Sequence, residues 1–365
     1  MIKYPVSKPS LSGMELDLVS ECFADNQLTH GPMVQRFEKQ FAEYVGAPFA
    51  LACSSGTTAL HLALLALNIG PGDEVLVPDV SFVATANAVS YTGATPVLVD
   101  IEPLTWSMNL KKASEAITDR TKAIIIVHLY GQPADMDNVA RLAHKHNLRI
   151  VEDAAEGLGG NWNGCALGTM GDIGTFSFYG NKILTTGEGG MCVTPDVNLL
   201  TKMRHYRGQG QHPMVRYFHT TVGYNYRMTD VQAAIGIGQL DNLDSRVQDR
   251  WRIFKFYDTA FGAWKERTTL PGAAPWLYTL ELPHTVDPIA VGAELLQKGI
   301  ETRPIFVPMH KLPMYEQSDD NFPESCALHQ RGLSFPTYNG LTADNVQEIV
   351  LEFFRTIQAD NRKQA

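Results

Sequence analysis

The sequence predicts an α/β protein in which a layered domain with a mainly parallel sheet precedes a smaller α+β unit. Two observations favour this class. Short apolar runs typical of buried strands alternate with helix-like segments, and glycine and proline clusters separate them. A chain of 365 residues, 44% of them hydrophobic, is long enough to bury a large core and to form two domains.

The first sheet is expected to contain six strands, over residues 74–78, 95–100, 123–128, 148–152, 175–179 and 190–194. Helices are predicted over residues 84–91 and 136–146. The last two strands are joined around a glycine-rich turn at residues 187–190, so Lys182 lies in the loop between them. This arrangement predicts that Lys182 lies near the ligand-binding edge of the sheet.

A long helix over residues 231–255 is predicted to lead out of the first domain. We therefore expect a large domain over residues 1–248 and a small C-terminal domain over residues 249–365. The small domain should contain a strand at residues 276–282 and helices at residues 289–298 and 342–358.

Lys182 and Asp153 form the most informative pair in the chain. Lys182 stands between an aromatic strand-like run and a glycine-rich turn, and Asp153 ends an apolar run typical of a buried strand. Alone, such a lysine is usually a solvated charge, and such an aspartate usually caps a helix. Together they are what a pyridoxal 5′-phosphate (PLP) enzyme requires: a lysine that forms a Schiff base and an acid that keeps the pyridine nitrogen protonated.

A phosphate site is predicted upstream, at residues 54–58. Small and hydroxyl residues here precede an apolar, helix-like run, and Gly56 lets the backbone approach a ligand closely. Backbone N–H groups at a helix start bind phosphate dianions. Taken alone, the segment is better explained by ordinary helix capping through serine or threonine, and it is Gly56 that shifts the balance toward a phosphate site.

Charge and cysteine content exclude several classes of protein. The net charge of −9 argues against a general nucleic-acid binder, so an anionic substrate would need locally placed basic residues. The five cysteines lack metal-binding spacing, so we expect neither a metal site nor a disulfide framework. No signal region or apolar span of about 18 residues is visible, which favours a cytoplasmic protein without membrane contact.

Several motifs resemble the DegT/StrS family of sugar aminotransferases over nearly the whole chain. They are Ser54-Ser-Gly-Thr57, Gly70-Pro-Gly-Asp-Glu-Val75, Ala84-Thr-Ala-Asn87, Glu152-Asp-Ala-Ala155, Ser177-Phe-Tyr-Gly-Asn-Lys182, Thr186-Gly-Glu-Gly-Gly190 and Gly223-Tyr-Asn-Tyr-Arg-Met-Thr229. The resemblance implies a PLP-dependent aminotransferase of the aspartate aminotransferase type of fold (fold type I). It also implies a homodimer whose two active sites are each built from both subunits.

The resemblance assigns roles to individual residues. Lys182 would form the Schiff base and act as general acid and base, Asp153 would bind the pyridine nitrogen, and Phe82 would stack on the ring. Plain core packing is an alternative for Phe82. The phosphate would be bound by Gly56, Thr57, Ser177 and Asn225 of the partner subunit.

Substrate contacts are expected from four further residues. Arg227 of the partner subunit would bind a carboxylate or diphosphate, with a surface salt bridge as the alternative. His310, His219 and Arg216 are candidates for contacts with the sugar or diphosphate, or else a core histidine or an exposed arginine without such a role.

Glu156 departs from the family pattern, in which many members have glutamine. An amide can donate a hydrogen bond to the phenolic oxygen of the cofactor, whereas a carboxyl group can do so only when protonated. Glu156 is therefore expected to face a donor group or to have a raised pKa.

Softer motifs at residues 207–210, 224–227 and 301–310 look most like the perosamine-forming branch of the family. They imply transfer of an amino group from L-glutamate to C4 of GDP-4-keto-6-deoxymannose. A dTDP- or UDP-linked 3- or 4-keto sugar is the alternative. A related group of PLP-dependent 3-dehydratases has histidine in place of the lysine, and a noncatalytic regulator would be expected to lose Lys182 or Asp153.

Overall fold

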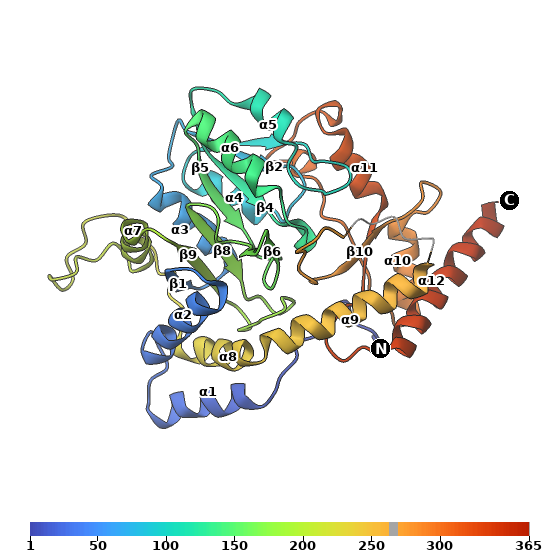
Figure 1. Cartoon of the computed structure of the whole chain (residues 1–365), viewed down its shortest axis with the longest axis horizontal. Coiled ribbons are helices and arrows are strands. Elements are labelled where there is room, and N and C mark those ends of the chain that lie inside the picture. Colours follow the sequence, from blue (N-terminus) through green and yellow to red (C-terminus); the bar gives the residue numbers. More distant parts are fainter. Residues whose placement is uncertain (263–268, 365) are drawn as a thin grey trace.

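A seven-stranded sheet forms the centre of the molecule, and a smaller three-stranded sheet lies beside it (Figure 1). The structure is a computed structural model that describes residues 1–262 and 269–364. The large sheet has the strand order β1-β9-β8-β5-β4-β2-β3. Its strands are β1 (Phe49–Cys53), β2 (Glu74–Pro78), β3 (Thr95–Val99), β4 (Thr121–Val127), β5 (Arg149–Asp153), β8 (Ile173–Ser177) and β9 (Gly190–Thr194).

The five strands β3, β2, β4, β5 and β8 pair in parallel, whereas β9 is antiparallel to both of its neighbours, β8 and β1. Parallel strands end at the same edge of a sheet, so the segments that follow β2, β4, β5 and β8 meet there. The predicted α/β class with a mainly parallel sheet is confirmed.

Helices cover both faces of the sheet because its strands are apolar on both sides. In β4, Ile125 packs toward one core, and Ile124 and Ile126 pack toward the other. One face is covered by α3 (Gly56–Ala66), α4 (Ala84–Tyr91) and α7 (Val197–Arg207). The other face is covered by α2 (Pro32–Val45), α5 (Leu110–Ala116), α6 (Met136–His146) and α8 (Asp230–Asp241), and α1 (Met14–Ala24) packs on α8.

The small sheet has the order β10-β12-β11 and is antiparallel throughout. Its strands are β10 (Tyr278–Glu281), β11 (Arg303–Pro304) and β12 (Gly332–Phe335). Strands β10 and β12 share an apolar core with α9 (Leu243–Phe261), α10 (Pro288–Gln297) and α12 (Ala343–Gln364). The remaining elements are the hairpin of β6 (Asn161–Trp162) and β7 (Cys165–Ala166), helix α11 (Pro323–Arg331) and the 3₁₀ turns η1 (Leu129–Gly131), η3 (Met309–Lys311) and η4 (Asp319–Asn321).

The single long helix predicted over residues 231–255 is wrong. Helix α8 ends at Asp241 and α9 begins at Leu243, and the two run end to end in Figure 1. Asn242 between them has φ −110° and ψ 15°, outside the helical region, and asparagine is a poor helix former that favours such junctions. The expected boundary at residues 248 and 249 lies inside α9, and the division into two domains stays a prediction.

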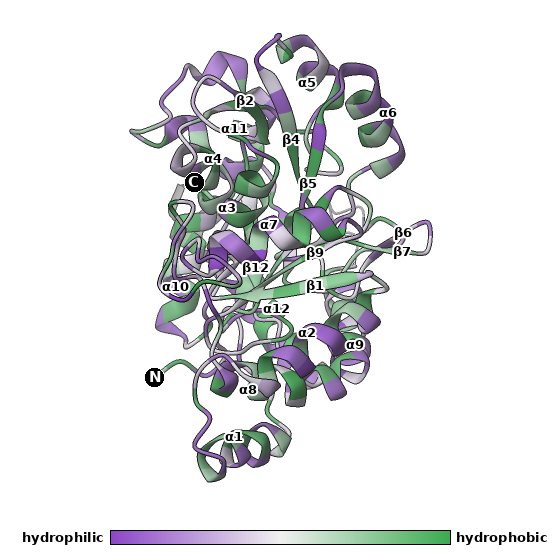
Figure 2. Ribbon diagram, turned by 90° about the vertical axis from the view of Figure 1, so that its left-hand side faces the viewer, coloured by the Kyte–Doolittle hydropathy of each residue, from purple (hydrophilic) through white to green (hydrophobic). Residues whose placement is uncertain are grey.

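Amphipathic patterns agree with this layered arrangement. In Figure 2, β1 is coloured as apolar along its length, whereas α2 and α6 carry both colours, as expected of helices with one buried face. Among the described residues, no helix combines the length and the apolar composition needed to cross a bilayer.

Candidate active site

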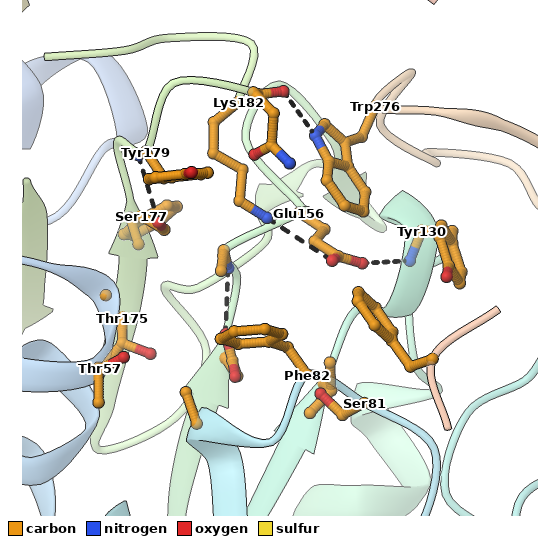
Figure 3. A pocket seen from close by; sticks show the side chains of 18 of the residues that line it. Thr57, Ser81, Phe82, Tyr130, Glu156, Thr175, Ser177, Tyr179, Lys182 and Trp276 are labelled. Atoms are coloured by element: carbon orange, nitrogen blue, oxygen red, sulfur yellow. Dashed lines mark hydrogen bonds and ion pairs between the residues drawn. The ribbon is translucent and has the colours of Figure 1, made fainter. Parts of the chain in front are cut away.

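A cavity of about 460 Å³ opens where the parallel strands end (Figure 3). Segments that follow β2, β5 and β8 form its floor, and residues of the C-terminal part close one side. Most of the residues predicted to bind the cofactor line it: Gly56, Thr57, Phe82, Asp153, Glu156, Ser177 and Lys182. The carboxyl edge of the parallel strands therefore collects side chains that lie up to 126 residues apart (56 to 182) in the chain.

Lys182 extends into this cavity from the loop between β8 and β9. Its amine lies 3.6 Å from Glu156 Oε1 and 3.9 Å from the ring centroid of Trp276, and Figure 3 shows it pointing toward both residues. The side chain is 12% exposed, and burial lowers the pKa of the amine. Burial thus favours the neutral amine, which is the form that can act as nucleophile and base.

Glu156 is buried beside Lys182 and accepts a hydrogen bond of 2.7 Å from the Tyr130 N–H. Burial raises the pKa of Glu156 to about 7, although the charge of Lys182 opposes the shift. Near neutral pH the carboxyl group can therefore be protonated and can donate a hydrogen bond, as the glutamine of many family members would.

Asp153 ends β5 and faces the cavity. Its carboxylate accepts hydrogen bonds from Thr85 Oγ1 (2.9 Å) and from the Ala155 N–H (3.2 Å). Burial raises the pKa of Asp153. Because both donors are neutral, a positively charged group brought into the cavity would stabilise the ionised form of Asp153.

The start of α3 also lines the cavity. Ser55 caps the helix in a reciprocal pair of hydrogen bonds with Thr58, which leaves the N–H groups of Gly56 and Thr57 without a partner inside the helix. A Cβ atom added at Gly56 would lie 2.8 Å from the Cβ of Ser177. Only glycine allows this close approach, which brings the Ser177 hydroxyl next to the helix start.

Phe82 follows β2 and is an apolar ring that remains 57% exposed in the described chain. It makes an edge-to-face contact with Phe306, at 6.0 Å between ring centroids. An exposed aromatic face inside a cavity can stack on a flat ligand.

These features fit PLP. The amine of Lys182 can bind its carbonyl carbon, Asp153 can hold a positive ring nitrogen, and the N–H groups at the start of α3 can bind its phosphate.

Four predicted residues lie elsewhere: Asn225, Arg227, His219 and Arg216. They belong to the segment after α7, part of which projects from the body of the molecule in Figure 1, and all four are exposed. In the described part of the chain, none of the four lines the cavity. This position was expected for Asn225 and Arg227, which were predicted to act in the site of a partner subunit.

His310 is fully buried and, among the described residues, is not part of the cavity wall. Its ring nitrogens face Asp79 and Asp319, at 2.6 Å and 3.0 Å. The predicted contact of His310 with a sugar or diphosphate therefore has no support from its position, because the ring lies among protein groups.

Several residues of the site were not singled out from the sequence, among them Thr85, Tyr130 and Trp276. Thr85 lies in the motif Ala84-Thr-Ala-Asn87, one helical turn beyond Phe82, and this spacing could have indicated it. For Tyr130 and Trp276, the neighbouring residues in the sequence do not indicate a role in the site. Trp276 reaches the site from the C-terminal part and donates its indole N–H to the Asn181 carbonyl at 3.1 Å, beside Lys182.

Comparison with known proteins agrees with this site. Residues 9–354 match the DegT/DnrJ/EryC1/StrS aminotransferase family. The chain is 46% identical to a GDP-perosamine synthase of Caulobacter vibrioides over 359 residues, covering 94% of this chain and 96% of that protein. It is 41% identical to a GDP-perosamine synthase of Escherichia coli O157:H7 over 351 residues, with 94% and 96% covered.

A solved structure has the same fold. The PLP form of the putative sugar aminotransferase Spr1654 from Streptococcus pneumoniae superimposes with a TM-score of 0.92 at 27% identity, over 97% of this chain and 98% of that chain. The chain belongs to the DegT/DnrJ/EryC1/StrS aminotransferase family. It is a PLP-dependent sugar aminotransferase with the fold of the type I PLP enzymes.

Proposed function

We propose that this enzyme transfers the amino group of L-glutamate to the C4 keto carbon of GDP-4-keto-6-deoxymannose and so forms GDP-perosamine for O-antigen or polysaccharide biosynthesis. The observation that carries the proposal is the cavity in which Lys182, Glu156 and Asp153 converge. The identity of 46% to a GDP-perosamine synthase over most of the chain supports the choice of sugar.

Lys182 has the central part in the proposed reaction. When bound, PLP supplies an electrophilic carbonyl and an electron sink. Lys182 would hold this group covalently, and its neutral amine would take the proton from the α-carbon of the donor. Its low exposure and lowered pKa favour the neutral amine that accepts this proton.

The neighbouring acids assist in different ways. Asp153, anchored by Thr85, holds a proton on the ring nitrogen of the cofactor. Glu156, with a pKa of about 7, donates or accepts a proton at the phenolic oxygen. Gly56, Thr57 and Ser177 bind the phosphate at the other end of the cavity and so fix the orientation of the ring.

Borohydride reduction of the purified protein tests the assignment of Lys182. The cofactor should become irreversibly attached to the peptide that contains Lys182. Lys182→Ala should still bind PLP, without covalent attachment and without turnover. The variant Lys202→Ala, at a lysine of α7 outside the cavity, serves as the control. Attachment at another lysine would contradict the proposal.

We also propose a homodimer with shared active sites. Five apolar side chains between residues 214 and 222 are exposed: Met214 (86%), Val215 (49%), Tyr217 (78%), Phe218 (55%) and Val222 (83%). A patch of this kind next to Asn225 and Arg227 supports burial of the segment against a second copy. Asn225 of the partner subunit would then complete the phosphate site.

Subunit mixing tests the shared site. Lys182→Ala and Asn225→Ala chains should each be inactive as pure dimers. A mixed dimer should regain activity, because one of its two sites then has both an intact Lys182 and an intact Asn225. Failure to recover activity in a dimer shown to be mixed would contradict a shared site.

The substrate is tested by parallel assays with GDP-, dTDP- and UDP-linked 4-keto sugars. Each is supplied with L-glutamate, and the release of 2-oxoglutarate is followed. The proposal expects the GDP sugar to be preferred, and Arg227 of the partner subunit offers a planar guanidinium for the glutamate carboxylate. A preference for a dTDP or UDP sugar would contradict the proposed substrate but not the proposed amino transfer.

A further inference from the structure

A cluster of three metal-ligating side chains lies outside the cofactor cavity, and we call it the His310 cluster. It consists of His310 on η3, Asp319 on η4 and Cys326 in α11. Among the described residues, these three bring one ligand atom each to within 4.8 Å of one another. His310 Nε2 lies 3.0 Å from Asp319 Oδ1 and 3.6 Å from Cys326 Sγ.

The imidazole ring of His310 is held in one orientation by its surroundings. Its Nδ1 lies 2.6 Å from Asp79 Oδ2, and its backbone N–H donates to Asp79 Oδ1 at 2.8 Å. Both side chains are fully buried. The ring also stacks on Phe322, with 4.5 Å between the centroids and 11° between the planes. The direction of Nε2 is therefore fixed by the fold.

This hydrogen bond to Asp79 determines what Nε2 can do. A neutral imidazole that donates from Nδ1 has a lone pair on Nε2, and this lone pair faces a carboxylate oxygen and a sulfur. A lone pair on Nε2 that faces a carboxylate oxygen can be satisfied by a cation between the atoms. Histidines that bind metals typically donate their other ring N–H to a carboxylate, and Asp79 Oδ2 lies 2.6 Å from His310 Nδ1, in position to accept it.

The spacing of His310 Nε2 and Cys326 Sγ agrees with a tetrahedral ion. At Zn–N and Zn–S distances of about 2.0 and 2.3 Å, tetrahedral geometry separates nitrogen and sulfur by about 3.5 Å. The corresponding atoms of His310 and Cys326 are 3.6 Å apart. Nitrogen, thiolate and carboxylate are also ligands that zinc accepts.

We propose that His310, Asp319 and Cys326 bind a zinc ion, with Asp79 as the group that orients His310. Binding replaces the thiol proton of Cys326, which is released to solvent, by a Zn–S bond. Water completes the coordination, because the Asp319 side chain is 60% exposed and leaves that side open. The other carboxylate oxygen of Asp319 is held by Lys311 Nζ at 2.6 Å.

The role of the proposed ion is to stabilise one wall of the cofactor cavity. It would connect η3, η4 and α11, while Asp79 links η3 to the loop that carries Phe82. The backbone of this loop is also attached to η3, because Met309 N–H donates to the Asp79 carbonyl at 2.8 Å. The sequence analysis predicts no metal site, since the three ligands are nine and seven residues apart (310, 319, 326) and match no metal-binding spacing of cysteines.

Metal titration of the purified holoenzyme, first freed of metal with a chelator, tests the proposal. Zinc should bind with one equivalent per chain, and X-ray absorption at the zinc edge should show one sulfur among nitrogen and oxygen ligands. Cobalt should give the visible bands of a tetrahedral site. Cys326→Ser should abolish the sulfur signal, and Asp79→Asn should weaken binding by about tenfold to a hundredfold.

Cys165→Ser provides the matched control, because Cys165 is an exposed free cysteine far from the cluster in sequence. This variant should bind zinc as the unaltered protein does. Adding chelator should lower the midpoint of thermal unfolding in both of these proteins but not in Cys326→Ser. Zinc without a sulfur ligand, zinc that is unaffected by Cys326→Ser, or no stoichiometric zinc would each overturn the proposal.

Discussion

Two buried carboxylates at the end of β5 differ in how completely the protein satisfies them. Glu152 and Asp153 are neighbours, so their side chains point to opposite faces of the sheet. Glu152 accepts hydrogen bonds from the N–H groups of Gly168, Met170 and Gly171, and His128 Nε2 lies 3.0 Å away. Within residues 1–262 and 269–364, Asp153 accepts two hydrogen bonds, from Thr85 Oγ1 and from the Ala155 N–H, and faces the cavity.

The comparison shows that burial and residue type alone do not identify a functional acid. Glu152 stabilises the loop at residues 168–171, because each oxygen has several donors. Asp153 and Glu156 are equally buried but have fewer donors, and burial raises the pKa of both. Buried acids with few hydrogen-bond donors, such as Asp153 and Glu156, can still bind a cationic ligand or exchange a proton.

The largest expected effect on stability comes from Glu152→Gln. An amide has one acceptor oxygen and would direct an NH₂ group at backbone donors, so we expect a loss of about 3 kcal/mol in the free energy of unfolding. Urea unfolding at a fixed PLP concentration measures it. If Glu152→Gln lost less unfolding free energy than Asp153→Asn, the distinction between the two carboxylates would be contradicted.

The next prediction concerns how the stability of the fold depends on pH. The folded state raises the pKa of Glu156 to about 7 from its ordinary 4.5, so the folded protein retains a proton that the unfolded chain loses in this range. Stability contributed by this group is therefore present below pH 4.5 and is lost as the pH rises through 7, by up to about 3 kcal/mol.

Glu156→Gln should remove this pH dependence, since its amide does not titrate. The check is the difference in unfolding free energy between the unaltered protein and the variant, measured without cofactor at several pH values. A difference that does not change between pH 4.5 and 8 would show that Glu156 has an ordinary pKa.

Asp153→Asn is expected to affect catalysis more than folding. Loss of the negative charge that faces the cofactor ring should lower kcat about a hundredfold, or about 2.7 kcal/mol in activation free energy. Stability should stay within about 1 kcal/mol, because burial already disfavours the charged carboxylate. Steady-state kinetics and urea unfolding of the same preparation separate the two effects. A large loss of stability would show that Asp153, like Glu152, mainly stabilises the fold.

Thr85→Val should have the smallest effect. It removes the 2.9 Å hydrogen bond to Asp153 at nearly constant volume, which costs about 1 kcal/mol and lowers kcat about fivefold. Thr194→Val is the matched control, because Thr194 is buried, does not line the cavity in the described part of the chain, and donates a 2.8 Å hydrogen bond to the Asp172 carbonyl. The control should lose similar stability and keep its kcat, and an equal fall in both kcat values would show that the effect of Thr85 is not specific.

The sequence by itself determined the α/β class, the strands that lead to the site, and the positions of Lys182, Asp153 and Gly56 in the cavity. These features follow from local patterns, since an apolar run predicts a buried strand and the carboxyl ends of parallel strands meet at one edge. The pair of Lys182 and Asp153 indicated PLP, and the family motifs added the amino transfer to a sugar.

Only the tertiary structure decided how these groups are surrounded. The break at Asn242, the position of Trp276 beside Lys182, the donors of Glu152 and the burial of His310 with Asp79 all depend on segments distant in the chain. The physical reason is that a pKa and a hydrogen-bond partner depend on desolvation and on what packs nearby, and neither is specified by the residues adjacent in sequence.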